Sequence, residues 1–308
     1  MPTASPGAGR KAARSIRWRR QLPATMALLP AAIIVVVAYI GCMVWTVRLS
    51  FTSSKLLPKF DWVGLGQYQR LFANERFIVS IENLFIFGTL FIAGSLVLGF
   101  LLAVFIDQRI RAEGVFRTIY LYPHALSFIV TGLVWRWFLN PTYGLQEMVR
   151  NMGFESFTFD WIVSREMAIY TIVVAAIWQA SGLVMAILLA GLRGIDQEIW
   201  KAVKVDGIPI WRVYWSVILP MLKPMVVTAT VLLSLAVVKV YDIVVAMTQG
   251  GPGISTEVPA KFVMDHLFNR ANVGLAMACA TVMLLAVVVV ISPWLYHQYG
   301  PRNRDKRA

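Results

Sequence analysis

Six long apolar segments alternate with polar connections along this chain of 308 residues. A helix rises about 1.5 Å per residue, so about 20 apolar residues suffice to cross a bilayer core of about 30 Å. The pattern therefore predicts an all-α integral membrane protein with six transmembrane helices. They are expected at about residues 26–48, 79–106, 116–139, 167–192, 221–247 and 273–297.

The composition agrees with a membrane protein, because 58% of the residues are hydrophobic and only 15% are charged. The mean hydropathy is +0.66, whereas a soluble domain carries about 25% charged residues. The formal net charge of +13 does not indicate nucleic-acid binding. The basic residues lie at the ends of apolar segments and form no patch with interleaved aromatic residues. We expect membrane lipid as a partner, and no nucleic acid.

Lysine and arginine are unevenly distributed over the connections. With six spans, both termini lie on one side of the membrane, and that side carries 18 of these residues against 8 on the other. Because cytoplasmic loops are enriched in Lys and Arg, both termini are predicted to be cytoplasmic. The expected organisation is a basic tail at 1–25, one membrane domain at 26–298 and a second basic tail at 299–308.

The sequence offers little chemistry of its own. Cys42 and Cys279 lie in apolar segments, and the three histidines are far apart in sequence, so we expect no metal site. No G-x-x-x-x-G-K-[ST] motif is present, so the chain is not expected to bind nucleotide phosphates. No cluster of catalytic His, Asp or Glu is visible either. We therefore expect no catalytic residues, no cofactor in this chain and no enzyme activity.

The polar connection at 193–220 contains a predicted helix–turn–helix. Asp196 is a good N-cap, and Glu198 favours the positive end of the helix that follows. Gly207 suits a left-handed residue that ends this helix, and Pro209 prevents its continuation. One apolar face is predicted on the first helix, formed by Ile199, Trp200, Ala202 and Val203.

A second short helix is predicted after the turn, with an apolar face of Trp211, Tyr214, Trp215 and Ile218. Pro220 would then occupy the first turn of the fifth span. An exposed aromatic face on a polar loop indicates a partner, which is either the lipid headgroup region or another protein. The angle between the two helices favours a protein partner, since a knob lies less well on a flat bilayer.

The stretch "EIWKAVKVDGIPIWRVYWSVILPMLKP" resembles the cytoplasmic signature loop of permease subunits in binding-protein-dependent ABC importers. Lys201 stands where the signature has Glu, and Val203 stands where it has its second Ala. The resemblance implies that this loop docks on a partner ATPase, which binds ATP and Mg. The implied coupling residues are Glu198, Ile199, Lys201, Ala202, Val203, Asp206, Gly207 and Pro220.

Three further stretches resemble sugar-importer permeases: "FRTIYLYPHALSFIVTGLVWRWFLNPTYGLQ", "WQASGLVMAILLAGLRGIDQEIW" and "VKVYDIVVAMTQGGPGISTEVPAKFVMDHLF". The resemblance implies a type I ABC importer permease fold, in the plasma (inner) membrane of a bacterium. The implied cargo is a glucose, maltose or α-glucoside type of sugar. The implied partners are a second permease subunit, two ATPase subunits and an extracytoplasmic sugar-binding protein.

Charged residues inside spans are costly and are candidates for function. Lys239 and Asp242 lie three residues apart on the predicted fifth span, so they are expected to share one helical face and to pair. The pair is either structural or part of the sugar path. The resemblance places Gln179 and Leu183 at sugar-facing positions, and Trp178 and Tyr241 are the aromatic candidates for stacking on a sugar ring.

The stretch "TQGGPG" at 248–253 has the composition of a turn. The resemblance implies that Gly250, Gly251 and Pro252 face the docked binding protein, and the alternative is an ordinary turn. For the whole chain, the main alternative is an ion-coupled secondary transporter of a small polar solute, for which Lys239 and Asp242 would be the only coupling pair. An integral membrane enzyme is disfavoured by the lack of a catalytic cluster.

Overall fold

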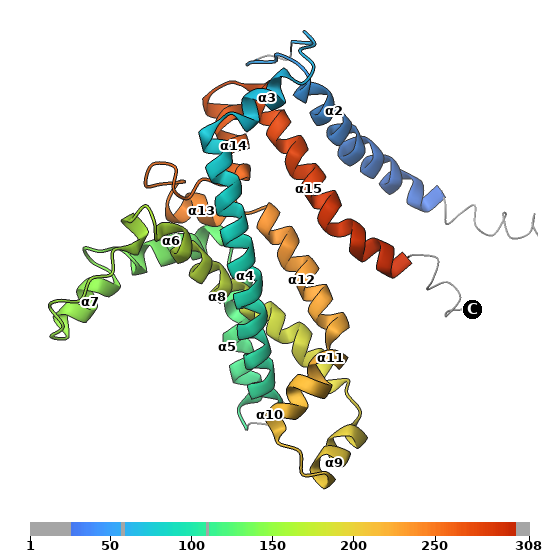
Figure 1. Cartoon of the computed structure of the whole chain (residues 1–308), viewed down its shortest axis with the longest axis vertical. Helices are drawn as coiled ribbons and strands as arrows, with labels where there is room; N and C mark the ends of the chain where they lie inside the picture. The colour runs from blue at the N-terminus through green and yellow to red at the C-terminus, as the bar shows by residue number, and fades with distance from the viewer. Residues whose placement is uncertain (1–25, 57–58, 109–110, 300–308) are drawn as a thin grey trace, which may run out of the picture.

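The computed structural model describes residues 26–56, 59–108 and 111–299 (Figure 1). The predicted tail at 1–25 and residues 300–308 of the second tail lie outside this part of the chain. Within it, the backbone is almost entirely helical, and the single extended pairing is an isolated bridge between Thr52 and Trp62. The all-α prediction is confirmed.

Three of the predicted spans are single helices that are long and apolar enough to cross a membrane. They are Met26–Ser50, which includes η1 (Val35–Ile40) and α2 (Gly41–Ser50), then α4 (Glu75–Asp107) and α8 (Ala168–Arg193). The sixth predicted span lies within α15 (Val273–Tyr299), which is apolar throughout Val273–Val289. Helix α4 extends beyond its predicted limits by four residues at the start and one at the end, and α8 is shifted by one residue from its predicted limits.

The third predicted span, 116–139, is wrong as a single helix. It is divided into α5 (Glu113–Ala125) and α6 (Phe128–Phe138), whose axes differ by 100°. The residues between them are extended, and the Ser127 side chain accepts a hydrogen bond from Val130 N at 3.2 Å. Ser127 is thus the N-cap of a new helix, a role that serine fills well because its hydroxyl replaces a missing backbone acceptor.

The fifth predicted span, 221–247, is also interrupted. It contains α12 (Lys223–Val238), a break at residues 239–241, and the short α13 (Asp242–Met247). The chain enters α12 through α10 (Ile210–Val213), η3 (Tyr214–Ile218) and α11 (Leu219–Met221), with a bend of 70° before α12. Pro220 lies in α11 and Pro224 in the first turn of α12, so the predicted place of Pro220 is wrong.

Helix α8 is the centre of the molecule. Two thirds of its most apolar stretch is buried, whereas none of the corresponding stretch of Met26–Ser50 is buried. Its main neighbours are α4 and α5. A Cβ atom at Gly182 would collide with the backbone carbonyl of Tyr120 on α5. Small residues at such crossings let helix backbones approach closely, which is a common basis of packing in membranes.

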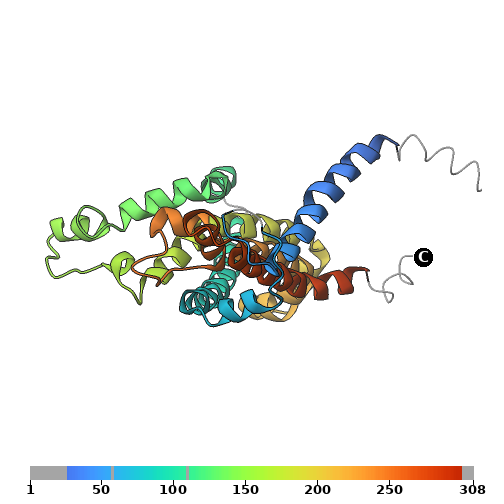
Figure 2. The same ribbon diagram turned by 90° about the horizontal axis from the view of Figure 1, so that it is seen from above.

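The remaining elements lie at the two ends of the helical body. Helix α9 (Gln197–Val205) and α10 are at one end, and α3 (Gly66–Phe72) and α14 (Pro259–Met264), which continues into η4 (Asp265–Asn269), are at the other (Figure 1). Helix α7 (Leu145–Asn151) projects beyond α6, and η2 (Trp161–Val163) precedes α8. Figure 2 shows that the N-terminal part of Met26–Ser50 leans away from the helical body.

Candidate functional site

The connection between α8 and α12 forms the predicted helix–turn–helix. Asp196 caps α9, because its Oδ1 accepts a hydrogen bond from Glu198 N at 3.0 Å. Gly207 has φ +63° and nothing surrounds its Cβ position. The left-handed backbone, and not lack of space, is therefore what requires glycine at this turn.

The apolar face of α9 packs against its own chain. Val203 is buried, and Ile199 and Trp200 are half-buried against the core. Ala202, predicted on the same face, is exposed instead. Among the candidates on α9 and its turn, Glu198, Lys201, Ala202, Asp206 and Gly207 are exposed. Pro220 is exposed as well, further along the chain.

A row of aromatic rings joins α9 to the membrane helix α4. Trp200 contacts Tyr214 edge to face at a centroid distance of 6.0 Å, and Tyr214 contacts Phe100 on α4 in the same way at 6.2 Å. Gln108, at the end of α4, also donates a hydrogen bond of 3.4 Å to the Tyr214 hydroxyl. Trp200 of α9 and Phe100 of α4 are thus connected through the ring of Tyr214 in η3. The second loop helix was predicted with Trp211 and Trp215 on one face with Tyr214, but both tryptophans are exposed while Tyr214 is half-buried.

Ion pairs tie the same region to the start of α5. Arg193, at the end of α8, donates to Glu113 Oε1 at 2.6 Å and lies 3.8 Å from Asp107 Oδ1. These groups, together with Trp200 and Lys201, line an open hollow of about 890 Å³ beneath the α9–α10 turn. The ends of α4, α5 and α8 thus meet the loop at one place.

The two interrupted spans meet at an open cavity of about 370 Å³. Phe128 lines it from the start of α6, and Lys239, Tyr241 and Asp242 line it from the break between α12 and α13. The remaining walls come from α4, α8, α12 and α13 and include the stacked rings of Phe87 and Phe91 on α4. The cavity thus combines aromatic faces with one positive and one negative side chain.

The predicted pairing of Lys239 with Asp242 is wrong. The helix breaks between them, and no ion pair joins them in the described chain. Lys239 is the C-cap of α12 and Asp242 begins α13. Each charge therefore faces the helix end of opposite sign, since a helix is negative at its C-terminus and positive at its N-terminus. Both side chains are exposed and remain available to a ligand.

The other predicted path residues do not line this cavity. Gln179 is buried, and its Nε2 donates a hydrogen bond of 2.8 Å to the carbonyl of Leu126, at the break between α5 and α6. Trp178 contacts Trp135 edge to face at 5.8 Å, and Leu183 is half-buried. Gln179 therefore stabilises the break between α5 and α6, because its amide donates the hydrogen bond that the Leu126 carbonyl no longer receives within a helix.

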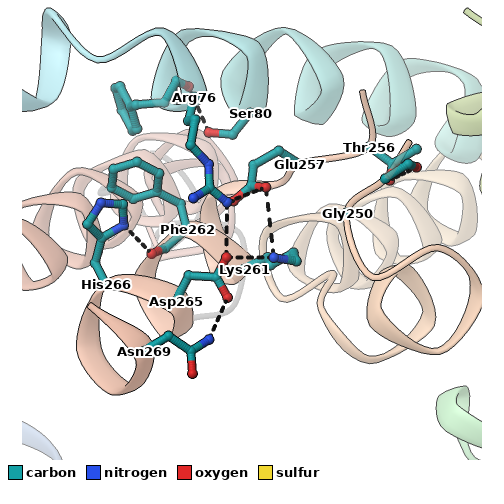
Figure 3. A network of polar contacts seen from close by, with 12 residues as sticks. Arg76, Ser80, Gly250, Thr256, Glu257, Lys261, Phe262, Asp265, His266 and Asn269 are labelled. Atoms are coloured by element: carbon teal, nitrogen blue, oxygen red, sulfur yellow. Dashed lines mark hydrogen bonds and ion pairs between the residues drawn. The ribbon is translucent and has the colours of Figure 1, made fainter. Parts of the chain in front are cut away.

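Sequence reasoning missed a network of charges at the opposite end of the molecule (Figure 3). Arg76, in the first turn of α4, donates to both oxygens of Glu257 at 2.9 Å and to Asp265 Oδ2 at 3.0 Å. Lys261 donates to the same Asp265 oxygen at 2.6 Å and lies 3.9 Å from Glu257. The Glu257 side chain is 1% exposed, so its charge is almost fully removed from water.

Burial and neighbouring charges shift the pKa values of Asp265 and His266 at this end of the molecule. Burial by itself raises the pKa of Asp265, but hydrogen bonds and charges from Lys261 and Arg76 outweigh burial and hold that pKa below its ordinary value. His266 stacks on Phe262 at 3.9 Å, and its Nδ1 lies 2.9 Å from the Phe262 carbonyl oxygen. Burial lowers the pKa of His266, and the charges of Arg270 and Arg76 add to this effect. The signal in the sequence was an acidic and a basic residue four apart, at Glu257 and Lys261 and again at Lys261 and Asp265.

The loop predicted to face a binding protein is held by hydrogen bonds within itself. The hydroxyls of Thr248 and Thr256 are 2.7 Å apart, and Thr256 also donates to the Gly251 carbonyl at 2.9 Å. Thr256 N donates to the Gly250 carbonyl at 3.2 Å. The peptide bond between Gly251 and Pro252 is cis. Gly250 is buried, while Gly251 and Pro252 are half-exposed at the surface of the molecule.

No group of three or more His, Cys, Asp or Glu in the described ranges could hold a metal ion. Broken membrane helices that meet at a cavity are typical of transport proteins, because helix ends and free backbone groups can then face a solute. The fold and these sites therefore define a polytopic transport subunit. The family of binding-protein-dependent transport system inner membrane components matches residues 113–305. This chain belongs to that family.

Individual relatives agree with this assignment. A probable ABC transporter permease protein of Pyrococcus horikoshii is 37% identical over 279 residues, which is 90% of this chain and 96% of the relative. A xylose/arabinose import permease protein of Haloferax volcanii is 32% identical over 85% of this chain and 84% of its own length. A bacterial alginate ABC transporter, solved in complex with an alginate pentasaccharide-bound periplasmic protein, has the same fold: the TM-score is 0.79 at 18% identity, over 92% of this chain and 96% of that chain.

Proposed function

We propose that the chain forms half of the membrane path of an ATP-driven sugar importer and is coupled to a separate ATPase through α9. The carrying observation is the outward face of α9, where Lys201, Ala202 and Val205 are exposed at the tip of a fixed helix–turn–helix. Ile199, Trp200 and Val203 fix the inner face of the same helix against the body. The outer face is thus presented for a partner, as the family resemblance implies.

The coupling route that we propose runs from α9 through Trp200 and Tyr214 to Phe100 on α4, the helix that also lines the central cavity. The ATPase partner would bind ATP and Mg, since this chain lacks a P-loop. Glu198, Asp206, Gly207 and Pro220 would shape the loop, and Lys201 would meet the ATPase with a positive charge where the signature has a negative one.

The solute site that we propose is the cavity at the two helix breaks. A sugar ring can stack on Phe87, Phe91 or Tyr241, while Lys239 donates hydrogen bonds and Asp242 accepts them. The relatives named for sugars support this class of cargo. Trp178, Gln179 and Leu183 would act behind this surface, by supporting α5 and α6.

The proposed assembly contains a second permease subunit, two ATPase subunits and an extracytoplasmic sugar-binding protein. The proposed location is a bacterial inner membrane, with cytoplasmic termini. The excess of Lys and Arg on the side of α9 supports this orientation. The uncovered apolar surface of Met26–Ser50 is available for lipid or for the second permease.

Site-directed crosslinking of the assembled complex tests the coupling surface. In a chain with Cys42→Ser, Ala202→Cys should crosslink to the ATPase subunit, and the crosslink should change with nucleotide. Phe268→Cys, which is exposed at the opposite end of the molecule, should not crosslink to it and is the matched control. The measurement is gel mobility together with mass spectrometry of the product.

Transport by purified subunits in vesicles tests the rest of the proposal. ATP should drive sugar uptake only when the ATPase and the binding protein are both present. Uptake by this chain without an ATPase, driven by an ion gradient, would replace the proposal with an ion-coupled secondary transporter.

A further inference from the structure

A second pocket, of about 270 Å³, lies at the far end of α13 from the solute cavity. Met247 and Thr248 line this pocket, whereas Asp242 and Ile243 at the other end of α13 line the cavity. Its walls come from five segments: the end of α6, the turn after it, η2, the end of α13 and the 248–253 loop. The pocket therefore exists only because the fold brings these separate segments together.

Two side chains of this pocket, Arg136 and Asn140, offer hydrogen-bond donors that no described residue uses. Arg136 is exposed, and it forms no hydrogen bond or ion pair within the part of the chain that the structure describes. Asn140 Oδ1 accepts from Thr142 N at 2.9 Å and from Thr142 Oγ1 at 2.6 Å. These two bonds fix the orientation of the amide, so its NH₂ group is the free end, and no described residue accepts from it.

The pocket contains no carboxylate among its lining residues. The Thr248 hydroxyl is already used, since it donates to the Val244 carbonyl at 3.0 Å and lies 2.7 Å from the Thr256 hydroxyl. Apolar side chains of Ile162, Val163, Met247 and Pro252 complete the wall of this open pocket. A guanidinium and a free amide NH₂ side by side in one pocket suit a ligand that carries a negative charge and only accepts hydrogen bonds.

A sugar, a lipid headgroup and a protein side chain are the three ligands to compare, and each requires different groups in the pocket. A neutral sugar hydroxyl both donates and accepts, and the side-chain acceptors of this lining, Asn140 Oδ1 and the Thr248 hydroxyl, are already hydrogen-bonded. Recognition of lipid headgroups by charge generally uses a cluster of four or more basic residues, and here a single arginine is present. The carboxylate of a protein side chain needs one guanidinium, and its methylene groups can pack against Ile162 and Val163.

We propose that this pocket receives an Asp or Glu side chain of the binding protein when that protein docks. The proposal rests on the proposed function, because it assumes a binding protein at this end of the molecule. Arg136 and Asn140 are then the anchors of the interface. The 248–253 loop is held in place by Thr248 and Thr256, so little order has to be gained on docking.

The experiment uses the assembled transporter in lipid nanodiscs and the binding protein that co-purifies with it, loaded with its sugar. The affinity of the binding protein is measured at several salt concentrations. Arg136→Gln should weaken binding by about tenfold or more, and Arg136→Lys should restore part of it. Arg136→Glu should weaken binding further. Arg165→Gln, which alters an exposed arginine outside the pocket, should bind like the unmodified complex.

Asn140→Asp gives a second, conservative test. It keeps the Oδ1 acceptor for Thr142 but removes the NH₂ donor and puts a carboxylate beside Arg136. Binding should again weaken by about tenfold. A charge exchange completes the set: Arg136→Glu should regain affinity for a binding protein in which one surface Asp or Glu is replaced by Arg.

The outcomes separate this inference from the proposed function. If the binding protein stimulates the unmodified complex but Arg136→Gln and Asn140→Asp bind it normally, the inference is wrong and the proposed function stands. If no binding protein stimulates the complex at all, the proposed function itself fails. If Arg136→Gln lowers uptake only of a carboxylated sugar, with normal docking, the pocket recognises acidic cargo and the docking proposal is overturned. A loss of activation by anionic lipid, with normal docking, overturns it in favour of a headgroup site.

Discussion

The two ends of the helical body differ in how far their paired charges are removed from water. At the α14 end, four charged side chains neutralise one another, and Glu257 is 1% exposed. At the α9 end, Arg193 is 42% exposed in its ion pairs, and Val205, Trp211 and Trp215 are uncovered. The charges at the α14 end are thus paired within the chain. The α9 end leaves apolar and aromatic side chains exposed, which is typical of a surface that meets a partner or lipid.

The largest expected effect comes from breaking the geometry of the uncovered end. Gly207→Val forces a β-branched residue into a left-handed backbone, so the turn between α9 and α10 should be lost. ATP-driven uptake should fall at least about a hundredfold, because even a small misplacement of functional groups can lower a rate by about that factor. Uptake into vesicles measures the effect, with membrane insertion checked separately.

Gly207→Asn is the matched control for this change. Asparagine tolerates the left-handed region better than valine does, and the space around the Gly207 Cβ position is open. It should retain most of the uptake. Equal losses in both variants would show that the left-handed turn is not what the site requires.

A substitution in the charge network at the α14 end should lower the free energy of unfolding. Glu257→Gln leaves Arg76 and Lys261 with a single carboxylate, from Asp265, in a buried site. Breaking a buried charge pair costs about 3–5 kcal/mol, because the remaining charge is uncompensated. Thermal unfolding in detergent measures the change. Arg270→Gln, at an exposed position without a described ion pair, should stay within about 0.5 kcal/mol.

A smaller loss of stability is expected between the two ends, at the broken third span. Gln179→Leu removes the donor to the Leu126 carbonyl and leaves that carbonyl unsatisfied. A buried unsatisfied group costs about 1–3 kcal/mol. Thermal unfolding measures it, together with affinity for the sugar, since the cavity wall at Phe128 follows the break. Gln179→Glu is uninformative as a control because it adds a charge, so Ser181→Ala, two residues further along α8, is preferred. Unchanged stability in Gln179→Leu would mean that another group satisfies Leu126.

The stability of the α14 end should depend modestly on pH and should fall as the pH is lowered. The pKa of His266 is lowered by burial and by the charges of Arg270 and Arg76. The folded protein therefore holds this proton less tightly than the unfolded chain does. The contribution of neutral His266 is fully present above a pH of about 6.5 and is lost as pH falls below it, by at most about 1.4 kcal/mol per pH unit.

Thermal unfolding at several pH values measures this dependence, and His266→Gln should flatten the curve between pH 7 and pH 5. Asp265 shares the site and its pKa is also lowered. Its contribution is present above a pH of about 4 and is lost below that value. A curve that keeps its slope near pH 6 in His266→Gln would assign the dependence to another group.

The smallest expected effect is at the aromatic row of the α9 end. Tyr214→Phe keeps both ring contacts and loses only the long bond of 3.4 Å from Gln108. Stability should change by less than about 1 kcal/mol, and ATP-driven uptake should persist. Tyr214→Ala removes the contacts with Trp200 and Phe100 and should uncouple ATP hydrolysis from uptake. Strong loss in Tyr214→Phe would show that the hydroxyl, and not the ring, transmits the movement of α9.

Local signals predicted the α9 loop well. Asp196 caps the helix and Gly207 is left-handed, because both features depend only on neighbouring residues in the chain. The same reasoning failed for the third and fifth spans, where apolar composition continues through the breaks at Ser127 and at residues 239–241. Apolar length reports that a segment avoids water, and it does not report whether its backbone stays helical.

The sequence by itself determined that this chain is an all-helical membrane protein with a polar helix–turn–helix loop, since burial of apolar side chains and local capping need no distant contact. Only the tertiary structure decided that two spans are broken around one cavity and that Gln179 supports a break. It also decided that Arg76 meets Glu257 and Asp265, which are 181 and 189 residues away. A broken helix exposes backbone groups and a buried charge requires a counter-charge, and the partners that satisfy them come from residues that only the fold brings together.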